Sequence, residues 1–244
     1  MGSEMCIRDS AGTIRANTTA LQTFTVQGNG TTSTYAAAAG ASAYAIAQGI
    51  NAASGSTGVS ATATTTATLS AFTAGSQSFT IQGAPKADGS ANPVTVTATM
   101  ATATDVGGLA AAINAQSGVT GINAIADTAT GKISLTQSQG YDIGVTNNLT
   151  ANNSTTLTGA SGAGVALVRG ATNAAAVGDS ATVGGSLAFN SSGSFTVGTS
   201  AAGTVLTTAA NSSSLSSVAS IDITKLTNGI PSGANDALQV IDSA

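Results

Sequence analysis

Histidine and tryptophan are absent from this chain of 244 residues, and Cys6 is its single cysteine. Without histidine, acid–base catalysis needs a pair of carboxylates with tuned pKa values, but the aspartates are isolated in the sequence. Even Asp236 and Asp242 are six residues apart on a predicted helix, so they point to different faces. Zinc prefers Cys and His ligands, and calcium needs an Asp-rich loop. The sequence therefore predicts no catalytic residue, no metal site and no cofactor.

Three lysines remain as candidate bases, but nothing in the sequence marks Lys86, Lys132 or Lys225 as buried. The many Ser and Thr side chains are not nucleophiles without a base beside them. Gly131-Lys132 is followed by Ile133, so it does not form a phosphate-binding loop of the G-x-x-x-x-G-K-[ST] type. This inventory argues against an enzyme.

One glycine pair resembles part of a dinucleotide-binding fingerprint. Gly28-Asn29-Gly30 follows a predicted strand, but position 33 is Ser where the fingerprint requires Gly or Ala. No acidic residue follows about 20 positions later to bind a ribose. The favoured interpretation is a tight turn.

Charge is also scarce. Charged residues make up 7% of the chain, against about 25% in ordinary globular proteins. The six basic residues are dispersed and the net charge is −4, so the chain lacks the basic patch that nucleic-acid binding requires. No apolar run approaches the roughly 18 residues of a membrane span. We therefore expect neither nucleic acid nor a membrane as a partner.

The first ten residues differ from the rest and contain Cys6, Glu4, Arg8 and Asp9. Met5 to Ser10 (MCIRDS) is typical of a translated sequencing adaptor, and it lacks the apolar region of a secretory signal. We expect residues 1–10 to be a non-native tail. Without them the chain has 5 basic and 8 acidic residues and no cysteine, which is compatible with export.

A repeated segment is the most informative feature present. Ile50-Asn51-Ala52 leads through Ser54-Gly55 to Thr57-Gly58-Val59, and Ile113-Asn114-Ala115 leads through Ser117-Gly118 to Thr120-Gly121-Ile122. The offset is constant, because 113 minus 50 and 122 minus 59 are both 63. Each copy also has an upstream strand pattern, at 24–28 and at 79–83. A repeated unit without catalytic side chains indicates a structural module.

Periodicity predicts the elements of the two copies. The first has a helix over 36–53, and the alternation over 59–71 predicts a half-buried strand or hairpin with a hydroxyl-coated outer face. In the second, Asp105 opens a helix, and a hairpin follows over 122–136. Each unit is then a small sheet with one helix across it. The helical stripes are Ala43, Ile46, Ala47 and Ile50, and Val106, Leu109, Ala110 and Ile113.

The remainder is less regular. Strands are predicted at 165–168, 187–189 and 195–197, with a hairpin turn at Asn190 to Gly193. This region is either a further small β-domain or a surface insertion. Ser232 then caps a last helix that runs to Ala244, which suggests a fragment at both ends. Its apolar stripe consists of Ala234, Ala237, Leu238 and Ile241.

The two I-N-A-x-S-G-x-T-G units resemble the IN-type motif of bacterial flagellins and of related hook and cap proteins. Residues 232–244 (SGANDALQVIDSA), preceded by Ile221-Asp222-Ile223, resemble the start of the flagellin C-terminal core helix. The resemblance implies an α+β fold of small β-rich modules, each with an Ala-rich helix, ending in the start of a long core helix. It also implies packing of the 234–241 stripe into a helical core.

The family implied is structural, and its members are extracellular subunits of the flagellar filament. The resemblance implies other flagellin subunits and a flagellar export chaperone as partners. The predicted division is 1–10 tail, 11–75 first IN-type module, 76–150 second IN-type module, 151–220 Ser/Thr/Gly-rich β or loop region, and 221–244 core helix. We expect this chain alone to stay monomeric. Two alternatives remain, a hook-associated or filament-cap protein and a Thr/Ser-rich surface adhesin.

Overall fold

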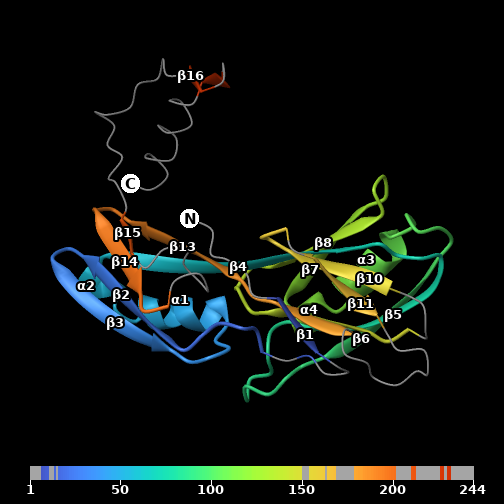
Figure 1. The fold of residues 1–244 in the computed structure, drawn as a ribbon, viewed down its shortest axis with the longest axis horizontal. Coiled ribbons are helices and arrows are strands. Elements are labelled where there is room, and N and C mark those ends of the chain that lie inside the picture. The colour runs from blue at the N-terminus through green and yellow to red at the C-terminus, as the bar shows by residue number, and fades with distance from the viewer. Residues whose placement is uncertain are drawn as a thin grey trace.

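Two lobes lie side by side in a computed structural model of the chain, and one long strand, β4, runs from the first lobe into the second (Figure 1). The structure describes residues 7–10, 14, 16–149, 154–162, 164–168, 179–201, 210–212, 226–227 and 230–231. Antiparallel sheets dominate both lobes, and each lobe contains one helix of two or more turns followed by a single short turn of helix. The predicted α+β class is confirmed.

The first lobe begins with a hairpin of β2 (Gln22–Gly28) and β3 (Thr31–Ala37). Asn29 and Gly30 join the two strands with φ angles of 50° and 72°, the left-handed conformation that a two-residue hairpin turn requires. The turn interpretation of this glycine pair is therefore confirmed. Helix α1 (Ala43–Asn51) and the short α2 (Ser54–Thr57) follow.

The predicted helix start at residue 36 is wrong. Ala36 and Ala37 belong to β3, where they pair with Thr23 and Gln22 of β2. The helix begins only after Ser42, whose hydroxyl accepts a hydrogen bond from the Ala45 backbone N–H at 3.3 Å, as an N-cap does. Alanine fits a strand or a helix, so the cap and the strand pairing decide the boundary. The predicted stripe is confirmed, since all four of its residues are buried.

Strand β4 (Val59–Ser70) is one continuous strand of 12 residues. Its side chains alternate between buried and exposed positions along most of its length, as predicted. The prediction fails at Ala71, which is exposed and has a φ of 59°, while Phe72 is buried in its place. The chain therefore turns at the end of β4, inside the second lobe, where Phe72 joins the core.

The second lobe repeats this order with β5 (Gly75–Gln82), β6 (Val94–Met100), α3 (Gly107–Asn114), α4 (Ser117–Thr120) and β7 (Ile122–Asp127). β8 (Lys132–Gln137) completes the predicted hairpin with β7, and β9 (Ile143–Asn147) follows.

Asp105 does not cap helix α3, contrary to the prediction. Val106 occupies the N-cap position and makes no side-chain cap bond. Asp105 Oδ2 instead accepts from the Ala101 backbone N–H at 3.1 Å, which closes the turn before the helix. The predicted stripe is nevertheless confirmed, because its four residues are all buried.

The helix of each unit lies between two sheets rather than across one. β5 and β6 belong to the sheet β1-β12-β9-β5-β6, whereas β7 and β8 belong to the sheet β11-β10-β4-β8-β7. Helix α3 packs against both β6 and β7, and α1 packs against both β3 and β4. The prediction of a single sheet under each helix is corrected, because the chain changes sheets as it passes through the helix.

Strands that follow residue 150 return to both lobes. β10 (Ser154–Gly159) pairs with the far end of β4 and with β11 (Gly164–Val168). β12 (Ser180–Val183) pairs with β9, and β13 (Ser186–Ser191) pairs with the near end of β4. The strands predicted at 165–168 and 187–189 are thus confirmed in position, and the one predicted at 195–197 is confirmed by the strand over Phe195–Thr199.

The hairpin predicted at Asn190 to Gly193 is wrong. β14 (Phe195–Thr199) pairs with β2 and with β15 (Ala210–Ser212), while β13 pairs with β4. The intervening residues therefore connect two different sheets. The other described strands are β1 (Ile7–Ser10), which pairs with β12, and the pair β16 (Leu226–Thr227) and β17 (Ile230–Pro231).

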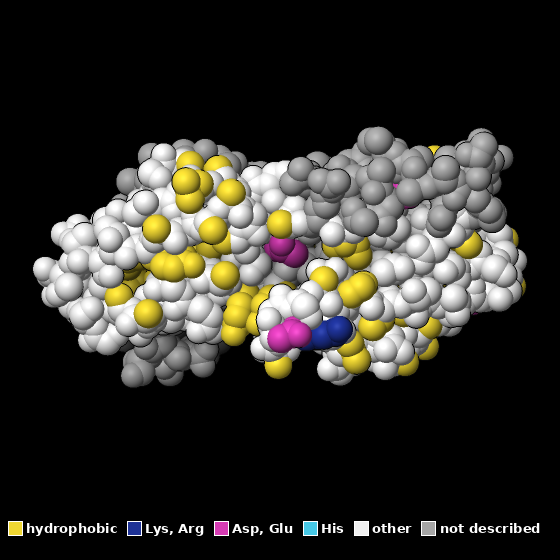
Figure 2. Space-filling model, turned by 90° about the horizontal axis from the view of Figure 1, so that it is seen from below, with side chains coloured by type: hydrophobic (Ala, Val, Ile, Leu, Met, Phe, Trp, Pro, Cys, Tyr) yellow, Lys and Arg dark blue, Asp and Glu magenta, His cyan; other side chains and the backbone are white. Residues whose placement is uncertain are grey.

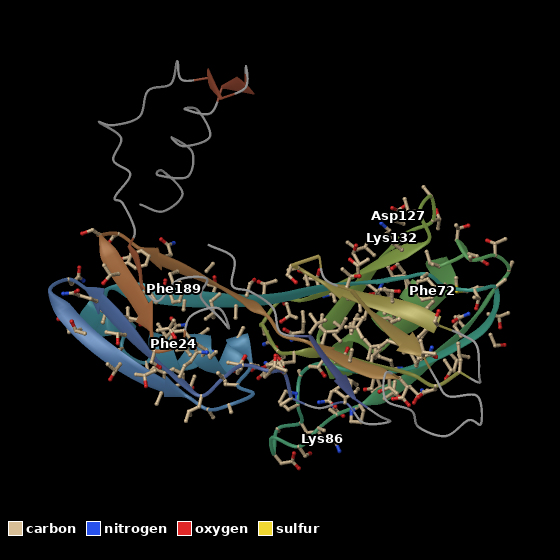
Figure 3. All side chains as sticks on the ribbon, in the orientation of Figure 1. Phe24, Phe72, Lys86, Asp127, Lys132 and Phe189 are labelled. Carbon is tan, nitrogen blue, oxygen red and sulfur yellow. The ribbon has the colours of Figure 1, made fainter. Side chains whose placement is uncertain are left out.

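Each lobe has its own hydrophobic core, and β4 contributes to both. Val59, Ala61 and Ala63 join Phe24 and the α1 stripe in the first core. Ala67 and Leu69 join the second core, which contains the α3 stripe and Phe79. Figure 3 shows Phe24 and Phe72 in separate lobes, toward opposite ends of this strand. The predicted final helix, with Ala234, Ala237, Leu238 and Ile241, lies outside the described residues.

Candidate functional site

The asparagine of each repeated motif forms a clip between a helix end and the following strand. Asn51 Nδ2 donates to the Ala61 carbonyl oxygen at 2.8 Å, and Asn51 Oδ1 accepts from the Ala61 N–H at 2.7 Å. Asn114 makes the same two bonds with Ala124, also at 2.8 and 2.7 Å. A side-chain amide offers the same donor and acceptor as a peptide group. Each asparagine therefore bonds to the strand as a neighbouring strand would.

The motif threonine joins the short helix to the strand. Thr57 Oγ1 donates to the Ala53 carbonyl at 3.0 Å and accepts from the Val59 N–H at 3.3 Å. In the second copy, the Thr120 hydroxyl does the same with the Gln116 carbonyl at 3.0 Å and the Ile122 N–H at 3.2 Å. The two units thus match bond for bond.

The motif glycine ends the short helix. Gly58 and Gly121 have φ angles of 67° and 68°, in the left-handed region. Their N–H groups donate to the Ser54 and Ser117 carbonyls at 2.8 and 2.7 Å. This is the usual glycine C-cap, since a side chain is strained in that conformation.

A second glycine in each unit allows the upstream strand to approach the motif. A Cβ atom added to Gly28 would lie 2.3 Å from the Thr57 carbonyl oxygen, and one added to Gly83 would lie 2.1 Å from the Thr120 carbonyl oxygen. The Ala84 N–H donates to that same Thr120 oxygen at 2.8 Å. The glycine that ends each upstream strand pattern is therefore required by close contact, a reason that the sequence did not reveal.

We expect Gly83→Ala to lower the free energy of unfolding by about 1–3 kcal/mol, because the new methyl group overlaps a backbone oxygen. Urea unfolding followed by circular dichroism measures this loss. Gly118→Ala is the matched control, since a Cβ there has no heavy atom within 4 Å, and alanine favours the short helix. Equal stability of the two variants would contradict the close-contact interpretation.

The described candidate ionisable residues lie at separate places, except that Asp127 and Lys132 are register partners in the β7–β8 hairpin. Lys86 lies on the β5–β6 loop, away from Asp127 and Lys132, which lie near the end of the β7–β8 hairpin (Figure 3). Hydrogen bonds from Thr130 lower the pKa of Asp127, and hydrogen bonds from Ser90 lower the pKa of Asp88. Among the described residues, no group of three potential metal ligands is present. Lys225, Asp236 and Asp242 lie outside the described residues.

One carboxyl group differs from the others. Asp142, Ser42 and Gln82 line a hollow of about 260 Å³. The face of the molecule drawn in Figure 2 carries few charged side chains. Asn17 Nδ2 donates to both Asp142 oxygens at 2.9 and 3.0 Å and to the Ala41 carbonyl at 3.1 Å. Burial raises the pKa of Asp142 to about 6, although the Asn17 bonds act in the opposite direction.

Sequence reasoning missed this junction. Asn17 Oδ1 accepts from the Thr19 N–H at 2.8 Å, as an asparagine in a turn does, but the residue is also buried. The rings of Tyr44 and Tyr141 stack beside it with centroids 4.1 Å apart, and burial raises the pKa of Tyr141 to about 12. These pairs are far apart in the sequence, and no local pattern marks them. They join the two lobes.

The fold and the clips define a duplicated structural module, in which a helix, a polar motif and a strand are fixed together. The sequence model of a family described as "Flagellin hook IN motif" matches residues 23–75 and 78–139. Each of the two matched segments contains one clip, with its asparagine, its threonine and the strand that follows. A search of the curated proteins found no match.

This chain is a flagellin-like protein that carries two copies of the flagellin hook IN motif. The family is structural, forms the bacterial flagellar filament and serves motility. Its subunits assemble with other flagellin subunits outside the cell. Within the described part of the chain, no helix has the length and apolar character needed to cross a lipid bilayer.

Proposed function

We propose that this chain forms the outer, solvent-facing part of a flagellar filament subunit and acts through its shape, without catalysis. The observation that carries the proposal is the pair of matched clips, each of which uses its asparagine and threonine side chains in internal hydrogen bonds. The alternating β4 strand supports it, because the exposed face carries hydroxyl groups and few charges. Such a surface suits a solvated outer layer.

The partners would be other flagellin subunits and a flagellar export chaperone, with no nucleic acid and no membrane. We propose the division predicted from the sequence, with modules at 11–75 and 76–150, a third region at 151–220 and the core helix from 221. Pairing of β10 to β14 with strands of both lobes means that the third region contributes to both modules. The residues proposed to pack in the filament core are Ala234, Ala237, Leu238 and Ile241.

The description of the matching family also favours a second candidate, a hook-associated or filament-cap protein, because it names the hook. Such a protein would use the same modules at one end of the filament rather than along it. Position on the organelle therefore distinguishes the two roles. A Thr/Ser-rich adhesin would instead lie on the cell envelope.

Immunogold electron microscopy tests the location directly. Antibodies raised against the folded chain are applied to intact cells of the source organism, and we expect gold particles along the whole filament. Antibodies absorbed with the same purified chain provide the control. Label confined to the filament tip or to its base would favour the hook-associated or cap role. Label on the cell body alone would contradict both flagellar roles.

A further inference from the structure

Strand β7 lies at the edge of the sheet β11-β10-β4-β8-β7, so only one of its sides is paired, with β8. An open strand edge presents unpaired N–H and C=O groups that can pair with another chain. Residues 122–126 (INAIA) contain no charge and no proline, a composition typical of segments that self-associate as strands. The unpaired side of β7 is therefore a potential contact surface.

The IN motif occupies this surface. Alternate residues of a strand direct their backbone groups to opposite sides, so Ile122, Ala124 and Ala126 share the side away from β8. Asn114 bonds both backbone groups of Ala124, and Thr120 Oγ1 accepts from the Ile122 N–H. Both backbone groups of the central residue, Ala124, are thus hydrogen-bonded, and so is one of the two backbone groups of Ile122.

We infer that the second IN motif closes a strand edge that would otherwise pair with a second copy of this chain. The pairing would be antiparallel, β7 against β7, with Ala124 at its centre. Little charge opposes it, because the net charge of the chain is −4 over 244 residues. The outward face of β7 would also favour it, since Ile125 is 71% exposed. Between Ile122 and Ala126 the contact strand is therefore uncharged, and its exposed face there consists of Asn123 and Ile125.

The first copy provides a matched control within the same molecule. Asn51 makes the equivalent bonds to Ala61 of β4, but this side of β4 is not an open edge. From Thr65 onward β4 pairs with β8, and Gly140 packs against Ala63. Loss of the Asn51 clip would therefore weaken the fold without exposing a strand edge long enough for pairing.

The test compares Asn114→Ala with Asn51→Ala in the complete chain. Both variants lose two hydrogen bonds, so we expect both melting temperatures to fall by about 3–6 °C. Sedimentation velocity over a dilution series measures association. We expect the dimer fraction of Asn114→Ala to rise about tenfold over that of the unsubstituted chain, and Asn51→Ala to remain monomeric.

A second substitution separates edge pairing from mere loss of stability. Ile125→Lys places a charge beside the same edge, and charged residues oppose strand pairing. We expect Asn114→Ala with Ile125→Lys to return to the monomer while its melting temperature stays low. Should Asn114→Ala fail to fold, Asn114→Ser takes its place, because the shorter side chain does not reach Ala124. A folded variant that stays monomeric, or association that Ile125→Lys does not reverse, would overturn the inference.

Discussion

Replacing Phe79 by alanine is expected to lower the melting temperature of the whole chain, by about 10 °C, in a single transition. Phe79 is fully buried in the second core and meets the Phe72 ring edge-to-face, with centroids 6.2 Å apart. Truncation of a buried Phe costs about 3–5 kcal/mol, a large part of the stability of a typical domain. Calorimetry measures both the shift and the number of transitions.

A single transition is expected because the two cores share β4. If the second lobe unfolds, β4 loses its β8 and β10 partners and is held only by β13 and the first core, and β12 to β14 connect the lobes again. Phe24 is the equivalent residue of the first core and is also fully buried, so Phe24→Ala is the matched variant. Hydrogen exchange should show lower protection in both lobes for each variant. Two separate melting steps, or a loss of protection confined to one lobe, would show that β4 does not couple the cores.

Acidification from pH 7 to pH 4 is expected to stabilise the Asp142 junction. The folded state holds a proton on this carboxyl up to a pKa of about 6, whereas the ordinary value is 3.8. Between these values the folded chain binds more protons than the unfolded chain, so stability falls as the pH rises. The protonated Asp142 carboxyl contributes about 2–3 kcal/mol to the free energy of unfolding below about pH 4. This contribution is lost above about pH 6.

The Asp142→Asn variant isolates this effect. An amide resembles the neutral carboxyl group, so we expect the variant to be more stable than the unsubstituted chain at pH 7 and equal to it near pH 4. Subtracting the unfolding free energies of the two proteins at each pH removes the contributions of Asp88 and Asp127. The pKa values of these two groups are lowered, so their pH dependence has the opposite sign. If the difference in unfolding free energy between the two proteins stays constant from pH 4 to pH 7, Asp142 does not titrate as its burial indicates.

Local patterns predicted most of the individual elements. The α1 and α3 stripes, the alternating β4 strand and the β7–β8 hairpin depend on periodicities of a few residues, which the sequence displays directly. The repeat also identified the site, because Asn51 and Asn114 stand at the same place in both copies. The repeat could not reveal the role of these asparagines, because their partners Ala61 and Ala124 bond through the backbone and their side chains show no pattern.

Errors arose where long-range contacts decide between local alternatives. Ala36 and Ala37 read as helix by composition, but their pairing with β2 makes them strand. The segment at 190–193 has turn residues, yet β13 and β14 pair with different sheets. Asp142 and Asn17 are 125 residues apart, and nothing near either residue predicts that they meet. Topology, rather than propensity, was the missing information.

The return of β14 to β2 has a consequence for biosynthesis. Gln22 accepts a hydrogen bond from the Thr199 hydroxyl, 177 residues later in the chain. Translation proceeds from the N-terminus, so β2 is made before β14, and its second edge is covered only after residue 199 has been synthesised. The first sheet therefore cannot be completed while the chain between β3 and β14 is still being synthesised.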